Sequence, residues 1–170
     1  MPKARPLTPS IIDDFFNAHL PSRLAAITSV IDHWSAVGRL PGPASKRVQW
    51  ALIYSAIPMT RMLLEFLGIV HTPGKGLVEK SREAYRPDDV YVEELGGRFV
   101  RKAELLPGEE DTLKVFLHMA NKVAHFTYDF RVEDGGIDGH HTIRSAVRIT
   151  LRLLDSHLYD ASGRRKIEVK

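Results

Sequence analysis

The residues best suited to chemistry lie together near the middle of the second half of the chain. His118, Asn121, Lys122 and His125 are spaced i, i+3, i+4 and i+7, so an α-helix would project all four side chains from one face. An imidazole can move a proton near neutral pH, and an ammonium group can hold a phosphate. The spacing therefore predicts either an anion-binding or acid–base site, or the solvated face that every amphipathic helix presents to water.

A second group of cationic residues follows on the last predicted helix. Arg144, Arg148 and Arg152 recur every four residues and form a basic stripe. Such a stripe can follow a phosphate backbone. It can equally be a solvated face, salt-bridged in part to the acidic loop around Asp134 and Asp138. No aromatic residues that could stack on bases are interleaved with it.

Arg61 and Glu65 are charged residues on a predicted helix that is otherwise apolar. Their i, i+4 spacing favours an internal ion pair, because a buried charge without a partner is costly. The alternative is that Arg61 points into a cleft near His125 and offers its guanidinium group to a phosphate. The partner of Arg61 decides between the two interpretations.

The sequence contains no convincing set of metal ligands. The chain has no cysteine, which excludes disulfides, thiolate nucleophiles and cysteine-ligated metals. His140 and His141 follow Asp138, but adjacent histidines diverge on a helix or strand, and a His-Glu-x-x-His motif is absent. We expect neither a metal nor a cofactor.

The run Asn121-Lys122-Val123-Ala124-His125 resembles the signature region of HEPN-domain proteins. The resemblance implies a short and usually dimeric helical bundle, and many members of that family are metal-independent ribonucleases of toxin–antitoxin and phage-defence systems. Their signature is an arginine a short distance before a histidine. The histidine matches His125, whereas the place of the arginine is taken by His118, Met119 or Ala120.

Most of the elements that must position these residues are predicted to be helices. Thr8-Pro9 begins a first helix, which Pro21 kinks or restarts and Gly38 ends. The helix over about 44–67 is apolar around most of its circumference, so we expect it to be central, buried and kinked at Pro58. Further helices are expected over about 107–128 and 142–158.

The segment between the predicted helices over about 44–67 and 107–128 is the least regular. Gly96-Gly97 lies between two short runs rich in β-formers, 90–92 and 98–100. This pattern predicts a small β-hairpin near 88–103, with an irregular segment that contains a helical turn as the alternative.

Length and composition fit one soluble domain. The chain has 170 residues, of which 44% are hydrophobic and 26% charged, and its formal net charge of +3 is compatible with an anionic ligand without arguing for one. Arg61 and Glu65 interrupt the longest apolar run, which therefore fails as a membrane span. The basic, proline-rich start lacks the apolar core of a secretion signal, so we expect a cytoplasmic protein.

These observations predict a mainly α-helical single domain over 1–170, with flexible ends at 1–7 and 163–170, that forms a homodimer away from membranes. The first functional hypothesis is an RNA-associated protein of ribonuclease type, with His125, His118 and Asn121 as catalytic residues. Its phosphate- or RNA-binding residues would be Lys122, Arg61, Arg144, Arg148 and Arg152. The second hypothesis is a non-enzymatic helical interaction or regulatory protein. An arginine within reach of His125 would favour the first.

Overall fold

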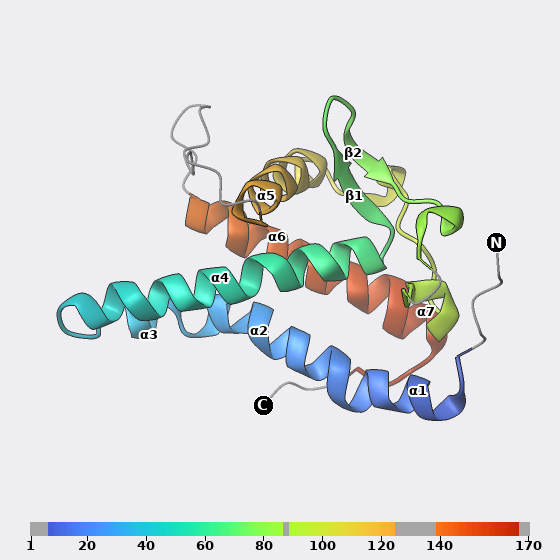
Figure 1. The fold of residues 1–170 in the computed structure, drawn as a ribbon, viewed down its shortest axis with the longest axis horizontal. Coiled ribbons are helices and arrows are strands. Elements are labelled where there is room, and N and C mark those ends of the chain that lie inside the picture. Colours follow the sequence, from blue (N-terminus) through green and yellow to red (C-terminus); the bar gives the residue numbers. More distant parts are fainter. Residues whose placement is uncertain (1–6, 87–88, 125–138, 167–170) are drawn as a thin grey trace.

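The computed structural model describes residues 7–86, 89–124 and 139–166. Within these ranges the chain is mainly α-helical, with a single two-stranded hairpin, which confirms the predicted fold class (Figure 1). No helix in the described ranges is both long and apolar enough to cross a membrane.

The N-terminal helical region is continuous but contains a widened turn. Helix α1, Pro9–Asp14, is capped by the Thr8 side chain and passes into a π-helix, Phe15–His19, and then into α2, Leu20–Asp32. Pro21 has no N–H to donate to the preceding turn, and the π-helix ends two residues before it, at His19. The restart predicted at Pro21 is thus a change of helix type, not a break. A short helix, α3, Trp34–Val37, ends at Gly38 as predicted.

Helix α4, Pro43–Phe66, crosses the molecule and packs against α2, α5 and α6 (Figure 1). Ile53, Ile57 and Leu64 on one face are buried. The prediction of burial around most of the circumference is wrong, because Trp50, Tyr54 and Met62 are 53%, 46% and 43% exposed. Apolar periodicity shows which residues tolerate burial, but the number of neighbouring elements decides how many faces are covered. The helix continues through Pro58, and a bend there stays a prediction.

The hairpin follows α4 directly. Strand β1, Ile69–Thr72, pairs antiparallel with β2, Gly76–Glu79, so that Ile69 lies opposite Glu79 and Thr72 opposite Gly76. The turn contains Gly74 with a φ of 77° and is followed by Gly76 with a φ of 73°, a backbone region that favours glycine. Both strands contact α5, which places the turn beside that helix.

No hairpin forms where the Gly96-Gly97 pair predicted it. The region has the irregular form that was the alternative, with 3₁₀ turns at Arg82–Ala84, Val92–Leu95 and Lys102–Glu104. Glycine is needed at position 97 because the backbone there passes close to that of His157, and an added Cβ would lie 2.5 Å from the His157 carbonyl oxygen. The glycine pair therefore fits the loop against the C-terminal helix and does not turn one strand onto another.

The remaining helices complete the core. Helix α5, Glu109–Ala124, begins with three acidic residues and buries Leu113, Phe116, Leu117 and Ala120. Helix α6, Gly139–Leu154, packs on α4 and α5 and continues as a π-helix, Asp155–Tyr159, and as α7, Asp160–Ser162. In the described part of the C-terminal tail, Arg164 lies 4.3 Å above the Phe16 ring and Lys166 pairs with Asp155 at 2.6 Å.

Candidate functional site

Two adjoining cavities lie along the hairpin and share His71 and Asn121. The smaller has a volume of about 630 Å³ and lies between the β1–β2 turn and the polar face of α5. We call it the lysine groove. Its functional side chains are those of Lys75, Lys114, Lys122, His71, His118 and Asn121.

The lysine groove contains a pair of imidazole rings. His71 on β1 faces His118 on α5 with 5.6 Å between ring centroids and an interplanar angle of 66°. The Nδ2 atom of Asn121 lies 3.5 Å from Nδ1 of His71, a long contact that joins the strand to the helix. The predicted face of α5 is therefore concave at His118, Asn121 and Lys122, because the hairpin lies over it.

Sequence spacing had no means of finding His71. It precedes Asn121 by 50 residues and lies on a strand that was not predicted. The available signal was its position next to the Pro73-Gly74 turn, and a turn by itself does not show which helix the strand will meet.

The charges in the lysine groove favour an anion. Three lysines and no carboxylate are among its described lining residues. The pKa of His71 is lowered from its ordinary value, first by partial burial and then by the neighbouring His118 and Lys114. His71 therefore favours its neutral form in the pH range where an ordinary histidine is still partly protonated.

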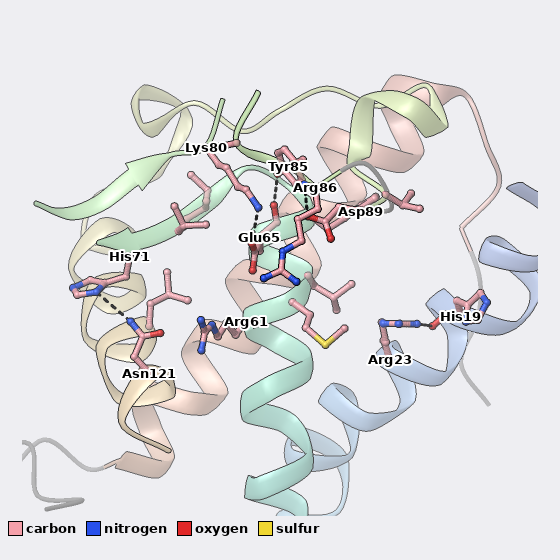
Figure 2. Close-up of a pocket in the computed structure, with 18 of the residues that line it drawn as sticks. His19, Arg23, Arg61, Glu65, His71, Lys80, Tyr85, Arg86, Asp89 and Asn121 are labelled. Carbon is pink, nitrogen blue, oxygen red and sulfur yellow. Dashed lines mark hydrogen bonds and ion pairs between the residues drawn. The ribbon is translucent and has the colours of Figure 1, made fainter. Parts of the chain in front are cut away.

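The larger cavity, of about 950 Å³, lies between α4, the helical region around His19, the hairpin and the loop that carries Tyr85 and Arg86 (Figure 2). We call it the arginine cleft, because Arg23, Arg61 and Arg86 line it. Its carboxylates are those of Glu65 and Asp89, and Lys80 also faces it.

The predicted ion pair between Arg61 and Glu65 is wrong. Glu65 instead pairs with Lys80 at 2.6 Å, and Lys80 lies 3.8 Å above the ring of Tyr85. The Lys80 side chain is only 10% exposed and needs a nearby counter-charge, whereas Arg61 can extend toward the open cleft. Figure 2 shows the Arg61 guanidinium group directed toward the side of the cleft that holds Asn121. Among the described residues Arg61 has no hydrogen bond or ion pair.

The other predicted site residues line neither cavity or lie outside the described residues. His125, Asp134 and Asp138 lie outside the described residues. Arg144, Arg148 and Arg152 are on α6, and none of them lines either cavity. Arg152 binds Glu109 through two contacts, Nε to Oε1 at 3.0 Å and a terminal nitrogen to Oε2 at 2.5 Å. Its guanidinium group thus connects α6 to the first turn of α5.

The described residues include no cluster of three or more side chains suited to holding a metal ion. His140, considered above as a weak ligand candidate, instead lies against Trp34 with 4.2 Å between ring centroids. Comparisons with protein-family models, with curated proteins and with solved structures find no match to this chain. Its function has to be inferred from the chemistry of the two cavities.

Proposed function

We propose that this protein binds RNA in the lysine groove and cleaves it without a metal ion, using His71 and His118 as the proton-transfer pair. The observation that carries the proposal is the 5.6 Å approach of two imidazole rings within a groove lined by three lysines. This function agrees with the ribonuclease class that the resemblance around His125 implies. It adds a second histidine from another element.

Two imidazoles and several ammonium groups match what metal-free RNA cleavage requires. A base removes the proton of the ribose 2′-hydroxyl, whose oxygen attacks the adjacent phosphorus. An acid protonates the departing 5′-oxygen, which leaves a 2′,3′-cyclic phosphate and a free 5′-hydroxyl. His71, with its lowered pKa, suits the base, and the exposed His118 suits the acid. Lys75 and Lys114 would stabilise the negative charge that develops on the phosphorus oxygens.

The test is cleavage of single-stranded RNA in the presence of a chelator. His71→Ala and His118→Ala should each lower the rate by about 10²–10⁴-fold, and DNA should not be cut because it lacks the 2′-hydroxyl. His141→Ala, an exposed histidine outside both cavities, is the matched control. His125→Ala tests the contribution predicted from the resemblance. Purified protein that neither binds nor cuts RNA at low salt would reject the proposal.

Binding can be tested separately from cleavage. Lys114→Ala should weaken RNA binding and reduce the slope of log K against log salt concentration by about 0.7, the value for one phosphate contact on a single strand. Lys46→Ala, at an exposed position early in α4, should leave both quantities unchanged. Fluorescence anisotropy over a series of salt concentrations measures both. Equal slopes for the two variants would remove Lys114 from the phosphate contacts.

A second candidate is a protein whose role is association, and the exposed face of α4 favours it. Trp50, Tyr54 and Met62 recur at i, i+4 and i+12 along a helix stripe, with Trp50 and Tyr54 stacked at 5.7 Å. Arg47 and Glu65 lie on the same stripe near its two ends, by helical phase. We propose a second copy of this chain as the partner, because antiparallel pairing would bring Arg47 of one copy toward Glu65 of the other.

The homodimer proposal is tested by light scattering on the full chain at micromolar concentrations. Trp50→Glu should convert a dimer into a monomer, whereas Ile11→Glu, a matched change at a 46% exposed position on α1, should not. A monomeric wild type would reject the dimer. A dimer without RNA binding or cleavage would favour the association role over the ribonuclease.

A further inference from the structure

We propose that the arginine cleft is a nucleotide-binding site in which Arg61 and Arg86 hold a terminal phosphate. This goes beyond the proposed cleavage of RNA, because both imidazoles of the proton-transfer pair line the lysine groove and only His71 also borders the cleft. The ligand class is a phosphomonoester attached to a nucleoside.

The phosphate end of the site consists of two arginines from different elements. Arg61 comes from α4 and Arg86 from the loop after the hairpin, and Figure 2 shows both guanidinium groups directed into the same cleft. Within the described chain neither guanidinium group has a hydrogen bond or ion pair, since the contact from Arg86 to Asp89 is made by its backbone N–H. Two planar donor groups suit a phosphomonoester, which carries a charge of about −2 near neutral pH.

The rest of the cleft suits a nucleoside better than a bare oxyanion. The Glu65 carboxylate is 42% exposed, and its ion pair with Lys80 uses Oε1, which leaves Oε2 available to accept from a hydroxyl or amino group. Met62, Val70 and Val90 provide apolar surface for a base. The volume of about 950 Å³ is within the range of roughly 300–1,000 Å³ typical of small-molecule sites.

The nucleotide can come from either of two sources that share this chemistry. One is a free mononucleotide. The other is the phosphorylated end of an RNA strand, because the arginine cleft and the lysine groove meet at His71 and Asn121. A strand in the groove would thus be able to extend its end into the cleft.

Calorimetric titration of the full-length protein with AMP, adenosine and inorganic phosphate tests the site. AMP should bind more tightly than either fragment, and Arg61→Ala and Arg86→Ala should each raise its Kd by at least about tenfold. Arg39→Ala, an exposed arginine outside both cavities, is the control and should leave the Kd unchanged. Arg61→Lys keeps the charge and loses the two-pronged donor geometry, so it should restore only part of the affinity.

His118→Ala separates this inference from the ribonuclease proposal. Of the two cavities, His118 lines the lysine groove alone, so its loss should lower the cleavage rate by about 10²–10⁴-fold and leave AMP binding intact. If the protein lacks ribonuclease activity but AMP binding depends on Arg61 and Arg86, the nucleotide site stands alone. Should Arg61→Ala fail to fold, as judged by circular dichroism, Arg86→Ala at its exposed loop position decides the outcome.

Paired RNA oligonucleotides that differ only in a terminal phosphate identify the source. A preference for the phosphorylated strand that disappears in Arg61→Ala assigns the site to strand ends. Binding of AMP without such a preference assigns it to a free nucleotide. The inference is overturned if AMP does not bind at millimolar concentration, if it binds no better than inorganic phosphate, or if neither arginine variant affects it.

Discussion

His157 is a buried histidine whose surroundings are set by two distant segments. Its side chain is 2% exposed in the second π-helix, with Nδ1 3.3 Å from the Arg98 carbonyl oxygen and Nε2 3.8 Å from Glu104. Burial lowers its pKa, and Arg98 acts in the same direction, while Glu104 opposes the change. The imidazole is therefore favoured in its neutral form inside the fold.

This burial predicts a loss of stability in mild acid. The folded-state pKa of His157 is below the unfolded value, so the unfolded chain binds the proton more readily. Its stabilising contribution is complete above the unfolded pKa, near 6.5, and declines as the pH falls below it, by at most about 1.4 kcal/mol per pH unit. Urea unfolding between pH 7.5 and 5.5 measures the slope, to which His71 contributes with the same sign.

The contribution of His157 can be isolated by substitution. His157→Gln should flatten the pH dependence of the free energy of unfolding over this range, whatever its effect at pH 7.5. His141→Gln, at an exposed position, should preserve the wild-type slope. An unchanged slope in His157→Gln would show that the histidine is not responsible.

Arg152 and Arg148 look equivalent in the sequence but should contribute differently to the free energy of unfolding. Arg152 makes two contacts with Glu109, whose side chain is only 12% exposed, whereas Arg148 is exposed on the same helix. Arg152→Ala should lower the free energy of unfolding by about 1–2 kcal/mol and Arg148→Ala by less than about 0.5 kcal/mol. Chemical denaturation of the two variants makes the comparison, and equal losses would contradict the structural role of Arg152.

At the scale of single residues, sequence spacing succeeded within one element and failed between elements. The i, i+3, i+4 pattern brought His118, Asn121 and Lys122 together, because helical geometry alone determines it. The pairing of His71 with His118 depends on how a hairpin docks on a helix. The same reason explains why Glu65 pairs with Lys80 and not, as predicted, with Arg61. The chain that leaves β2 brings Lys80 to Glu65.

At the scale of elements, the hairpin holds one wall of the lysine groove through glycine geometry. Gly76 has a φ of 73°, so Gly76→Ala would place an L-residue in the left-handed region at a cost of about 1–2 kcal/mol. Space is not the limitation, since the added Cβ would lie 3.7 Å from Cε of Lys114. We expect a displaced turn around Lys75 and weaker RNA binding with the helical content retained.

The matched control for the hairpin is Gly38→Ala. Gly38 has a φ of −60°, and its added Cβ would meet only ordinary contacts of 3.5 Å or more. Circular dichroism and RNA anisotropy compare the two variants. Equal RNA affinity in Gly76→Ala and wild type would mean that the turn does not need this conformation to form the groove.

The hairpin was the main element that the sequence patterns placed wrongly. Two glycines between β-forming runs predicted a turn at 96–97, but the same residue type serves close packing at Gly97. The strand-like residue after this pair joins another element instead, as the Val100 N–H donates to the Leu67 carbonyl oxygen at 3.0 Å. The local sequence shows where a glycine occurs, but only the tertiary contacts show why glycine is required there.

At the scale of the whole molecule, α4 has one face in the core and one face in solvent. Adjacent residues of that helix should therefore respond very differently to truncation. Leu63 is 2% exposed, and Leu63→Ala should lower the free energy of unfolding by about 2–5 kcal/mol. Met62 is 43% exposed, and Met62→Ala should cost less than about 0.5 kcal/mol in the monomer.

Equilibrium unfolding in urea at low protein concentration compares this pair. A similar loss for both variants would contradict the two-faced arrangement of α4. A concentration-dependent loss in Met62→Ala alone would instead indicate that its face is covered by a second copy.

Most of the global architecture followed from periodic patterns, because each long helix contains enough turns for its apolar face to be evident. Leu113, Phe116 and Leu117 on α5, for example, are spaced on one helical face and are buried. The exposed side of α4 was missed, since its apolar stripe has the same composition as a buried one. Only the arrangement of α2, α5 and α6 around it separates the two faces.

The widened turn at Phe15–His19 sets the rotational phase of everything that follows it in the first helical region. In this turn the Leu20 N–H donates to the Phe15 carbonyl five residues earlier, where a regular α-helix would use a residue four earlier. The π-helix thus accommodates one additional residue, so a one-residue deletion there would return the segment to regular α-helical hydrogen bonding and leave α1 and α2 close to their present phase. The relation between Phe15, stacked on Phe66 at 5.5 Å, and His19, at the edge of the arginine cleft, depends on the widened turn and would change locally. A one-residue insertion would instead rotate α1 by about 100° relative to α2, so this segment should tolerate a deletion better than an insertion.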